Sequence, residues 1–192
     1  MKKAVIVAFN QFTDVDVFLP WDLLNRVRLK QKDFQVKIVG TDAVHRSVCG
    51  IELAMQGSLE ECRDADLVFI ASGAGTRALY RDKNFLQQLP LDPAKQVICS
   101  MCSGALILAG LGLLDGLTAT TYPTAFEALK EMGISVVEDD HLVAHGNIAT
   151  AAGCLAAVDL MAWAVEKLYD EETAQAVIAS VKPVGQGMKC IY

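Results

Sequence analysis

Residues 96–109 read QVICSMCSGALILA, an apolar run that changes character once, at Cys102. Before Cys102 the run is typical of a buried strand, and after it the run is typical of an Ala/Leu helix. A sharp turn from strand to helix leaves little room for side chains, and Ser100 and Gly104 supply small residues on either side of it. The stretch therefore predicts a strand–turn–helix elbow that lifts the Cys102 side chain out of a sheet.

The same turn favours a reactive sulfur at Cys102. Its side chain would lie at the first turn of a helix, where unpaired N–H groups and the helix dipole favour an anion. A free thiol with a pKa near ~8.5 is only a few per cent ionised at neutral pH, and a fall of about 2 units would make it mostly thiolate. We therefore expect a lowered pKa at Cys102 and predict that its sulfur is a nucleophile.

Two other interpretations of Cys102 stay open. Free cysteine is among the most buried residue types, so the side chain can simply pack in the core. Cys99 and Cys102 also form a C-x-x-C pattern that is known from redox pairs. The redox pattern fits less well, because Cys99 falls inside the expected strand, whereas the first cysteine of such a pair usually opens a helix.

Composition and charge restrict the class of protein. The chain has 192 residues with 53% hydrophobic content, which predicts a single domain over residues 1–192 with a large core. A net charge of −6 argues against a nucleic-acid or anionic membrane partner. The apolar start at 4–8 is too short for a signal peptide, and no stretch is suited to span a membrane. We expect a cytoplasmic protein whose six cysteines are free thiols.

Strand-like and helix-like segments alternate along the chain. The expected strands are residues 4–9, 34–40, 66–71, the elbow strand, 118–122, 134–138, 142–144 and 147–151, with 48–57 as a hairpin or edge excursion. The expected helices are residues 15–28, 84–89, the elbow helix, 124–132, 154–169 and 171–181. This order predicts an α/β fold with a mostly parallel sheet sandwiched by helices, of the flavodoxin-like type.

In such folds the chemistry lies at the carboxyl ends of the strands. Three stretches meet that condition, namely residues 11–16, the glycine turn after Ala71, and Cys102. The glycine turn allows the backbone N–H groups of Gly73 and Ala74 to act with that of Ser103 as an oxyanion-type site, although a plain tight turn is the alternative.

The same turn also matches a dinucleotide-binding fingerprint, G-x-G-x-x-A at 73–78. That fingerprint is expected after the first strand of a unit, whereas here it follows the third expected strand. We therefore expect no nucleotide cofactor. No Cys/His spacing predicts a metal site either.

Titratable residues near the expected site have two interpretations each. Asp14 and Asp16 lie in the first strand-to-helix turn, where carboxylates often cap helices, but either could exchange a proton with Cys102. We assign Asp14 a capping role. Surface or loop roles are expected for His45, His141 and His145, although His145 could approach the site from a strand end.

The chain resembles the ThiJ/PfpI superfamily, relatives of the class I glutamine amidotransferases, over essentially its whole length. The resemblance rests on DVFLPWDLL at 16–24, SGAGTRAL at 72–79, MCSG at 101–104, LLDGLTATT at 113–121 and the segment 146–159. Within the superfamily it looks most like the isonitrile hydratase branch. Two positions depart from the pattern, because Tyr122-Pro123 stands where many members have His, and Ala71-Ser72-Gly73 replaces the usual Pro-Gly-Gly.

The resemblance implies an enzyme with Cys102 as nucleophile and Asp16 as acid. Thr121, Tyr122 and His145 are further candidates for the lining of its pocket. The missing histidine weakens a protease or amidotransferase reading, since a thiol hydrolase normally has an imidazole base. The leading hypothesis is attack of Cys102 on an electrophilic small molecule such as an isonitrile, giving an N-substituted formamide. The alternatives are glyoxalase or deglycase activity on dicarbonyls, and a redox sensor or chaperone in which Cys102 is oxidised to a sulfinic acid. The resemblance also implies a homodimer.

Overall fold

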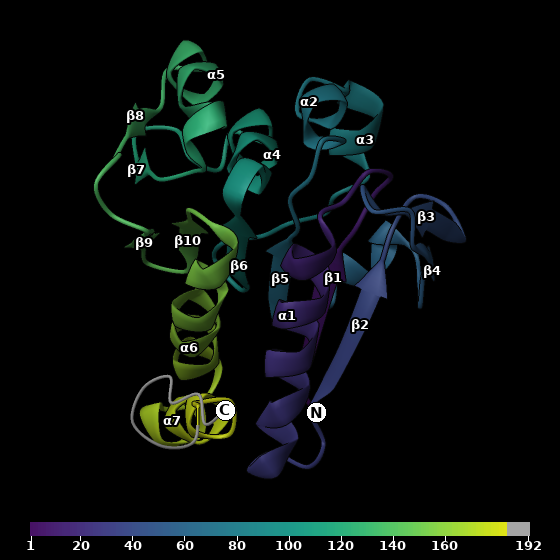
Figure 1. The fold of residues 1–192 in the computed structure, drawn as a ribbon, viewed down its shortest axis with the longest axis vertical. Coiled ribbons are helices and arrows are strands. Elements are labelled where there is room, and N and C mark those ends of the chain that lie inside the picture. The colour runs from purple at the N-terminus through teal and green to yellow at the C-terminus, as the bar shows by residue number, and fades with distance from the viewer. Residues whose placement is uncertain (184–192) are drawn as a thin grey trace, which may run out of the picture.

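A six-stranded sheet forms the centre of the protein (Figure 1), and the computed structural model describes residues 1–183. Its strands are β1 (Lys3–Val7), β2 (Gln35–Val39), β5 (Leu67–Ile70), β6 (Val97–Met101), β9 (Leu142–His145) and β10 (Ile148–Ala151). They lie in the order β2-β1-β5-β6-β10-β9. All neighbouring pairs are parallel except β10 with β9, so the predicted mostly parallel, flavodoxin-like sheet is confirmed.

Helices cover both faces of this sheet. One face packs against α1 (Asp14–Asn25), α6 (Ala157–Leu168) and α7 (Glu171–Ala179). The other face packs against α3 (Lys83–Gln87), α4 (Ala105–Gly110) and α5 (Phe126–Glu131), while α2 (Thr76–Leu79) lies beside α4.

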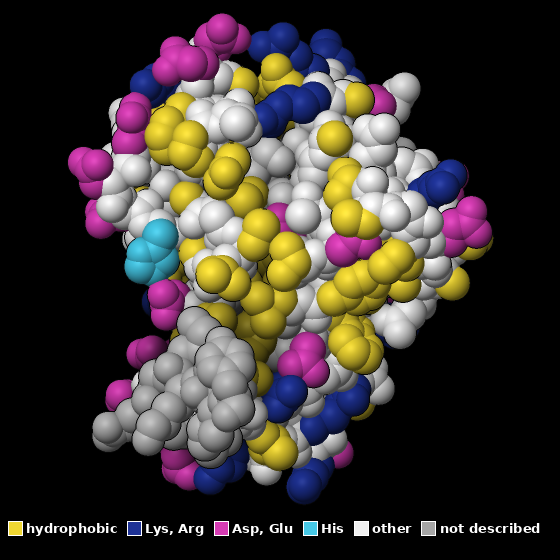
Figure 2. All heavy atoms as spheres, in the orientation of Figure 1, with side chains coloured by type: hydrophobic (Ala, Val, Ile, Leu, Met, Phe, Trp, Pro, Cys, Tyr) yellow, Lys and Arg dark blue, Asp and Glu magenta, His cyan; other side chains and the backbone are white. Residues whose placement is uncertain are grey.

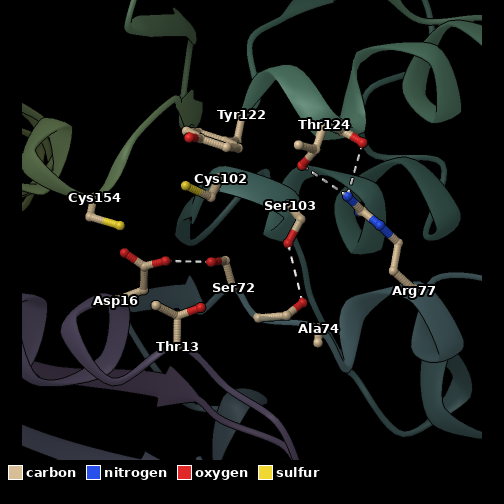
Figure 3. A pocket seen from close by; sticks show the side chains of 11 residues that line it. Thr13, Asp16, Ser72, Ala74, Arg77, Cys102, Ser103, Tyr122, Thr124 and Cys154 are labelled. Carbon is tan, nitrogen blue, oxygen red and sulfur yellow. Dashed lines mark hydrogen bonds between the residues drawn. The ribbon is translucent and has the colours of Figure 1, made fainter. Parts of the chain in front are cut away.

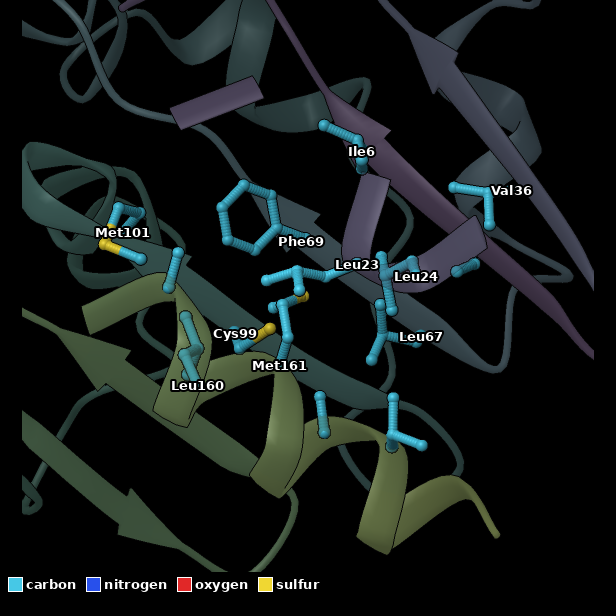
Figure 4. Close-up of a cluster of buried hydrophobic side chains, with 14 of the residues drawn as sticks. Ile6, Leu23, Leu24, Val36, Leu67, Phe69, Cys99, Met101, Leu160 and Met161 are labelled. Carbon is cyan, nitrogen blue, oxygen red and sulfur yellow. The ribbon is translucent and has the colours of Figure 1, made fainter. Parts of the chain in front are cut away.

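Alternation along each strand divides the core in two. In β1, Ile6 contributes to the cluster under α1 and α6, whereas Val5 and Val7 contribute to the cluster on the opposite face. Figure 4 shows the first cluster, where Leu23 of α1 and Met161 of α6 lie over the sheet. Because both faces are buried, the strands are apolar at nearly every position, which is why the sequence shows continuous apolar runs rather than strict alternation.

Most differences from the expected elements concern their ends. The expected helix 15–28 ends as an α-helix at Asn25 and continues as the 3-10 turn η1 (Arg26–Leu29). The expected excursion at 48–57 begins earlier, as the antiparallel pair β3 (Val44–Arg46) and β4 (Glu52–Ala54). The expected strands 118–122 and 134–138 shorten to β7 (Thr118–Ala119) and β8 (Ser135–Val136), which pair with each other outside the main sheet.

Further 3-10 turns complete the described chain: η2 (Leu59–Cys62), η3 (Cys102–Gly104), η4 (Pro123–Ala125) and η5 (Cys154–Ala156). The four-residue helix α2 is too short for a periodic pattern and was not predicted. Within residues 1–183, no helix combines the length and the apolar character that crossing a membrane requires. Of the six cysteines, five are free thiols in this part of the chain, and Cys190 lies outside the described residues.

Candidate active site

The elbow at Cys102 has the predicted geometry. Strand β6 ends at Met101, the turn η3 follows, and helix α4 begins at Ala105. Cys102 has a positive backbone φ of 46°, a conformation that costs free energy in non-glycine residues and often marks functional sites. A side chain at Gly104 would bring a Cβ to 2.8 Å from the carbonyl oxygens of both Ile70 and Ala71. The close approach of the elbow to β5 therefore requires glycine, as the sequence predicted.

Hydrogen bonds from buried hydroxyl groups hold the backbone and side chains of the elbow in place. The Thr121 hydroxyl donates a 2.7 Å hydrogen bond to the Cys102 carbonyl oxygen. On the neighbouring residue, the Ser103 hydroxyl accepts a 2.9 Å hydrogen bond from Thr76. These contacts hold the strained backbone in place and leave the Cys102 sulfur as the group that faces the pocket.

A pocket of about 320 Å³ lies at the carboxyl ends of the central strands (Figure 3). Its lining comes from the segments that follow β1, β5, β6, β7 and β10, as expected for this fold. The lining residues are Thr13, Asp16, Ser72, Gly73, Ala74, Arg77, Cys102, Ser103, Tyr122, Thr124 and Cys154. The two predicted catalytic residues, Asp16 and Cys102, are thus brought together.

Asp16 is a buried carboxyl group with an incomplete set of partners. Its Oδ2 accepts a hydrogen bond from the Ser72 hydroxyl, while its Oδ1 is buried and has no hydrogen-bond partner among the described residues. Burial raises the pKa of Asp16, although hydrogen bonds from Ser72 and Cys154 act in the opposite direction. The carboxyl therefore retains its proton to higher pH than an exposed aspartate does, which agrees with the acid role.

The expected fall in the pKa of Cys102 is wrong. The side chain is only 7% exposed, and burial together with the negative charge of Asp16 raises the pKa of the thiol. A hydrogen bond from the Gly153 backbone acts in the opposite direction but does not outweigh them. The helix that should have favoured a thiolate has only six residues and is preceded by a 3-10 turn. The protonated thiol is therefore the resting form of Cys102.

Cys154 is the site residue that sequence reasoning missed. A carboxylate oxygen of Asp16 and the sulfurs of Cys102 and Cys154 all lie within 4.8 Å of one another. Burial and the neighbouring Asp16 raise the pKa of Cys154 to about 12. The position of Cys154 in the sequence could have indicated its role, because Cys154 follows the expected strand 147–151 just as Cys102 follows its own strand. Cys154 was instead assigned to the start of a helix.

The same three groups form the set within residues 1–183 that could share a metal ion. Metal binding by cysteine requires the thiolate, and the pKa of each of the two thiols is raised. A metal ion at this position would have to displace the protons of both thiols.

The glycine turn after β5 also contributes to the pocket. Gly73 and Ala74 line the pocket together with Ser103. Gly73 has a φ of 150°, and a Cβ there would lie 2.1 Å from the Gln11 carbonyl oxygen. Only glycine allows this turn to pack so closely against the loop after β1.

The remaining predicted residues lie in different places. Tyr122 lines the pocket, whereas Thr121 lies beneath the elbow. His145 does not approach the site, because β9 runs antiparallel and places His145 beside Ile148, at the start of β10 and the opposite end of the sheet. It is exposed and hydrogen-bonds the Thr118 hydroxyl at 2.8 Å.

Two expectations outside the pocket need correction. Asp14 is not the N-cap of α1, because Thr13 occupies that position; a hydrogen bond from Ser47 instead lowers the pKa of Asp14. His45 is buried in β3 rather than on the surface, and burial lowers its pKa. His141 is exposed as expected and lies 2.7 Å from Asp159.

Comparison with known proteins agrees with this geometry. Residues 2–167 match the model of the DJ-1/PfpI family. A relative, the isonitrile hydratase of Pseudomonas putida, is 31% identical over 171 residues, which cover 88% of this chain and 73% of that protein.

Solved structures show the same fold. A THiJ/PfpI family protein from Pseudomonas syringae superimposes with a TM-score of 0.82 at 25% identity, covering 96% of this chain and 76% of that chain. Drosophila melanogaster DJ-1beta gives a TM-score of 0.82 at 21% identity, covering 94% of this chain and 97% of that chain. Because the family match spans nearly the whole sequence, the chain belongs to the DJ-1/PfpI family.

Proposed function

We propose that the protein is a cysteine-dependent enzyme that adds water to an isonitrile and releases an N-substituted formamide. The observation that carries this proposal is the Asp16 carboxyl group within 4.8 Å of the Cys102 sulfur in a pocket. None of the three histidines, all of them in the described part of the chain, lines that pocket. The proton partner of the sulfur is therefore a carboxyl group and not an imidazole. The 31% identity to an isonitrile hydratase supports the choice of substrate class.

The first half of the reaction uses one proton and one new bond. Asp16 takes the proton of the Cys102 thiol as the sulfur attacks the isonitrile carbon. Asp16 then delivers that proton to the same carbon, which leaves a thioimidate on Cys102. The raised pKa of Asp16 suits this exchange, because the carboxyl group must hold the proton before it passes it on.

Water completes the second half. It adds to the thioimidate carbon, the carbon–sulfur bond breaks, and Cys102 regains a proton as the formamide leaves. Backbone N–H groups of Gly73, Ala74 and Ser103 would stabilise charge on the oxygen that adds, since all three residues line the pocket. A volume of about 320 Å³ is at the small end of ligand sites and fits a small substrate.

A substrate panel tests the proposal. Purified protein is incubated with aliphatic and aromatic isonitriles and, separately, with methylglyoxal, and products are identified by NMR. Formamide release that disappears in Cys102→Ala supports the isonitrile reaction. Lactate from methylglyoxal without formamide from any isonitrile would instead identify the glyoxalase alternative and overturn the proposal.

We further propose that the protein forms a homodimer. Large apolar side chains are exposed on its surface, and Figure 2 shows hydrophobic groups gathered near the middle of one face, with most charged groups toward the edge. The exposed set is Val15, Leu29, Val44, Val48, Ile51, Tyr122 and Leu155, together with Met1. Exposed apolar surface of this kind commonly marks an interface. Sedimentation equilibrium decides the matter, because a mass of 20.7 kDa at all concentrations would exclude the dimer.

A further inference from the structure

The proposed reaction leaves one thiol of the pocket without a task. Cys154 begins the turn η5 directly after Gly153, and its sulfur lies within 4.8 Å of the Cys102 sulfur. Figure 3 shows the two sulfurs pointing toward one another across the pocket, with the Asp16 carboxyl beside them. Cys102 is buried, whereas Cys154 is partly exposed.

The other cysteines of residues 1–183 have different surroundings. Cys62 and Cys99 are fully buried in the two core clusters, and burial is the main cause of their raised pKa values. Cys49 is exposed and lies next to Asp14 in a separate cavity. Within the described chain, Cys154 is therefore the thiol placed to react with a modified Cys102.

We propose that Cys154 is a resolving cysteine, which closes a disulfide with Cys102 after a hydroperoxide has oxidised Cys102. The disulfide would remove the nucleophile from the pocket and would be opened again by a thiol reductant. The site would thereby acquire a reversible inactive state. This inference does not depend on which substrate the enzyme uses.

Oxidation of Cys102 and closure of the disulfide are two separate reactions. The Cys102 sulfur attacks the hydroperoxide, the oxygen–oxygen bond breaks, and a sulfenic acid forms while the alcohol, or water from hydrogen peroxide, leaves. The Cys154 sulfur then attacks the Cys102 sulfur, the sulfur–oxygen bond breaks, and water leaves. The proton of the Cys154 thiol passes through the Asp16 carboxylate to the departing oxygen.

Asp16 is placed for this proton transfer. A thiol with a pKa of about 12 is almost entirely protonated at neutral pH, so Cys154 needs a base before it can attack. An oxygen of the Asp16 carboxyl group lies within 4.8 Å of both sulfurs. The carboxyl group that serves the substrate reaction can thus also serve the disulfide.

The surroundings allow the sulfurs to approach. A disulfide requires about 2.05 Å between sulfurs, so the two atoms must move closer than they are in the structure. Gly153 has a φ of 84° and no atom lies within 4 Å of the position a Cβ would take, so the backbone before Cys154 is not crowded. Cys154 also borders a second cavity beside His141 and Asp159, which Cys102 does not line. This space gives water a route out.

The competing outcome is further oxidation of the same sulfur. A sulfenic acid that meets no thiol reacts with more peroxide to a sulfinic acid, which common thiol reductants do not reverse. Cys154 would intercept the sulfenic acid before that step. Its removal should therefore change both the product of oxidation and the reversibility.

Peptide mapping tests the proposal on the full chain. Wild-type protein is treated with excess hydrogen peroxide, free thiols are blocked, and the protein is digested without reductant. We expect a linked peptide that joins Cys102 and Cys154, and its loss on treatment with dithiothreitol. In Cys154→Ala and Cys154→Ser we expect Cys102 to carry two added oxygens that dithiothreitol does not remove. Cys49→Ser and Cys190→Ser are matched controls that should keep the linked peptide.

A wild-type protein in which Cys102 becomes a sulfinic acid while Cys154 stays a free thiol would overturn the proposal, as would a disulfide from Cys102 to Cys49 or Cys190. The wild-type map decides the question even if a Cys154 variant fails to fold, which circular dichroism would reveal. Because the readout is a disulfide and not turnover, failure here is distinguishable from failure of the isonitrile proposal.

Discussion

Two cysteine–aspartate pairs lie near the start of α1, and they differ in almost every physical respect. Asp14 lies near the exposed thiol of Cys49, and a hydrogen bond from Ser47 is the main cause that lowers the pKa of Asp14. Asp16 is fully buried beside Cys102, and burial raises its pKa. The same two residue types thus give a carboxyl group with a lowered pKa in one pair and a carboxyl group with a raised pKa in the other. Burial and neighbours, not residue type, select the pair suited to acid–base chemistry.

The largest expected difference between the pairs concerns the sulfurs. Cys102→Ser should abolish measurable formamide release, because the nucleophile is lost. Cys49→Ser should leave turnover within about twofold of wild type, since Cys49 does not line the pocket. Steady-state kinetics on the best substrate of the panel measures both. Comparable losses of turnover in Cys102→Ser and Cys49→Ser would show that the two cysteines do not differ in their importance for the reaction.

The two carboxyl groups should differ nearly as much. Asp16→Asn keeps a hydrogen-bonding side chain but carries no transferable proton, so turnover should fall by about 10²–10⁴-fold. Asp14→Asn should remain close to wild type, because Asp14 lies outside the pocket. The measurement is kcat/KM for each variant. Near wild-type turnover in Asp16→Asn, or a larger loss in Asp14→Asn, would show that the wrong acid has been chosen.

Thiol titration gives a smaller and more specific test. The charge of Asp16 raises the pKa of Cys102, so Asp16→Asn should lower it and speed alkylation of Cys102 at neutral pH. Asp14 raises the pKa of Cys49 in the same way, so Asp14→Asn should lower the pKa of Cys49 alone. Alkylation rates followed by peptide mass spectrometry across a pH series measure both. If the pKa values of both thiols changed in either variant, the two cysteine–aspartate pairs would not be independent of each other.

The smallest expected effect is on stability. As pH rises, the contributions of Asp16 and Asp14 to stability should change in opposite directions. The pKa of Asp16 is raised by folding, so its contribution to stability is present below the ordinary value of 3.8 and is lost as pH rises through the raised value. The pKa of Asp14 is lowered, so its contribution is present above 3.8 and is lost as pH falls through the lowered value.

Asp16→Asn should therefore gain stability relative to wild type as pH rises, whereas Asp14→Asn should lose stability relative to wild type over the same change. Urea unfolding from about pH 3 to pH 8 measures both differences. Slopes of the same sign in the two variants would contradict the opposite pKa shifts of the two carboxyl groups.

The elbow and the location of the site were predictable because they rest on local patterns. Small residues beside Cys102 limit what the backbone can do there, and the carboxyl ends of parallel strands meet at one edge of a sheet. The direction of an edge strand is not local, because alternating residues look alike in either direction. For that reason the sequence left open an approach of His145 to the site, whereas β9 carries it to the other end of the sheet.

Proton affinities were the least predictable feature. The pKa of Cys102 depends on how deeply the elbow is buried and on a carboxyl group from a segment more than eighty residues away in sequence. Neither quantity is visible in residues 96–109. Cys154 was missed for a related reason, since its importance comes from a three-group cluster that only the folded chain assembles.

Trapping the covalent intermediate would show whether Cys102 is the nucleophile that works with Asp16 as its proton partner. Protein that turns over an isonitrile is quenched in acid, digested and mapped by mass spectrometry. We expect the peptide with Cys102 to gain the full mass of the isonitrile, because addition loses no atom, and we expect no adduct in Cys102→Ser. Formamide release without an adduct on Cys102, or with the adduct on Cys49 or Cys154, would contradict that expectation.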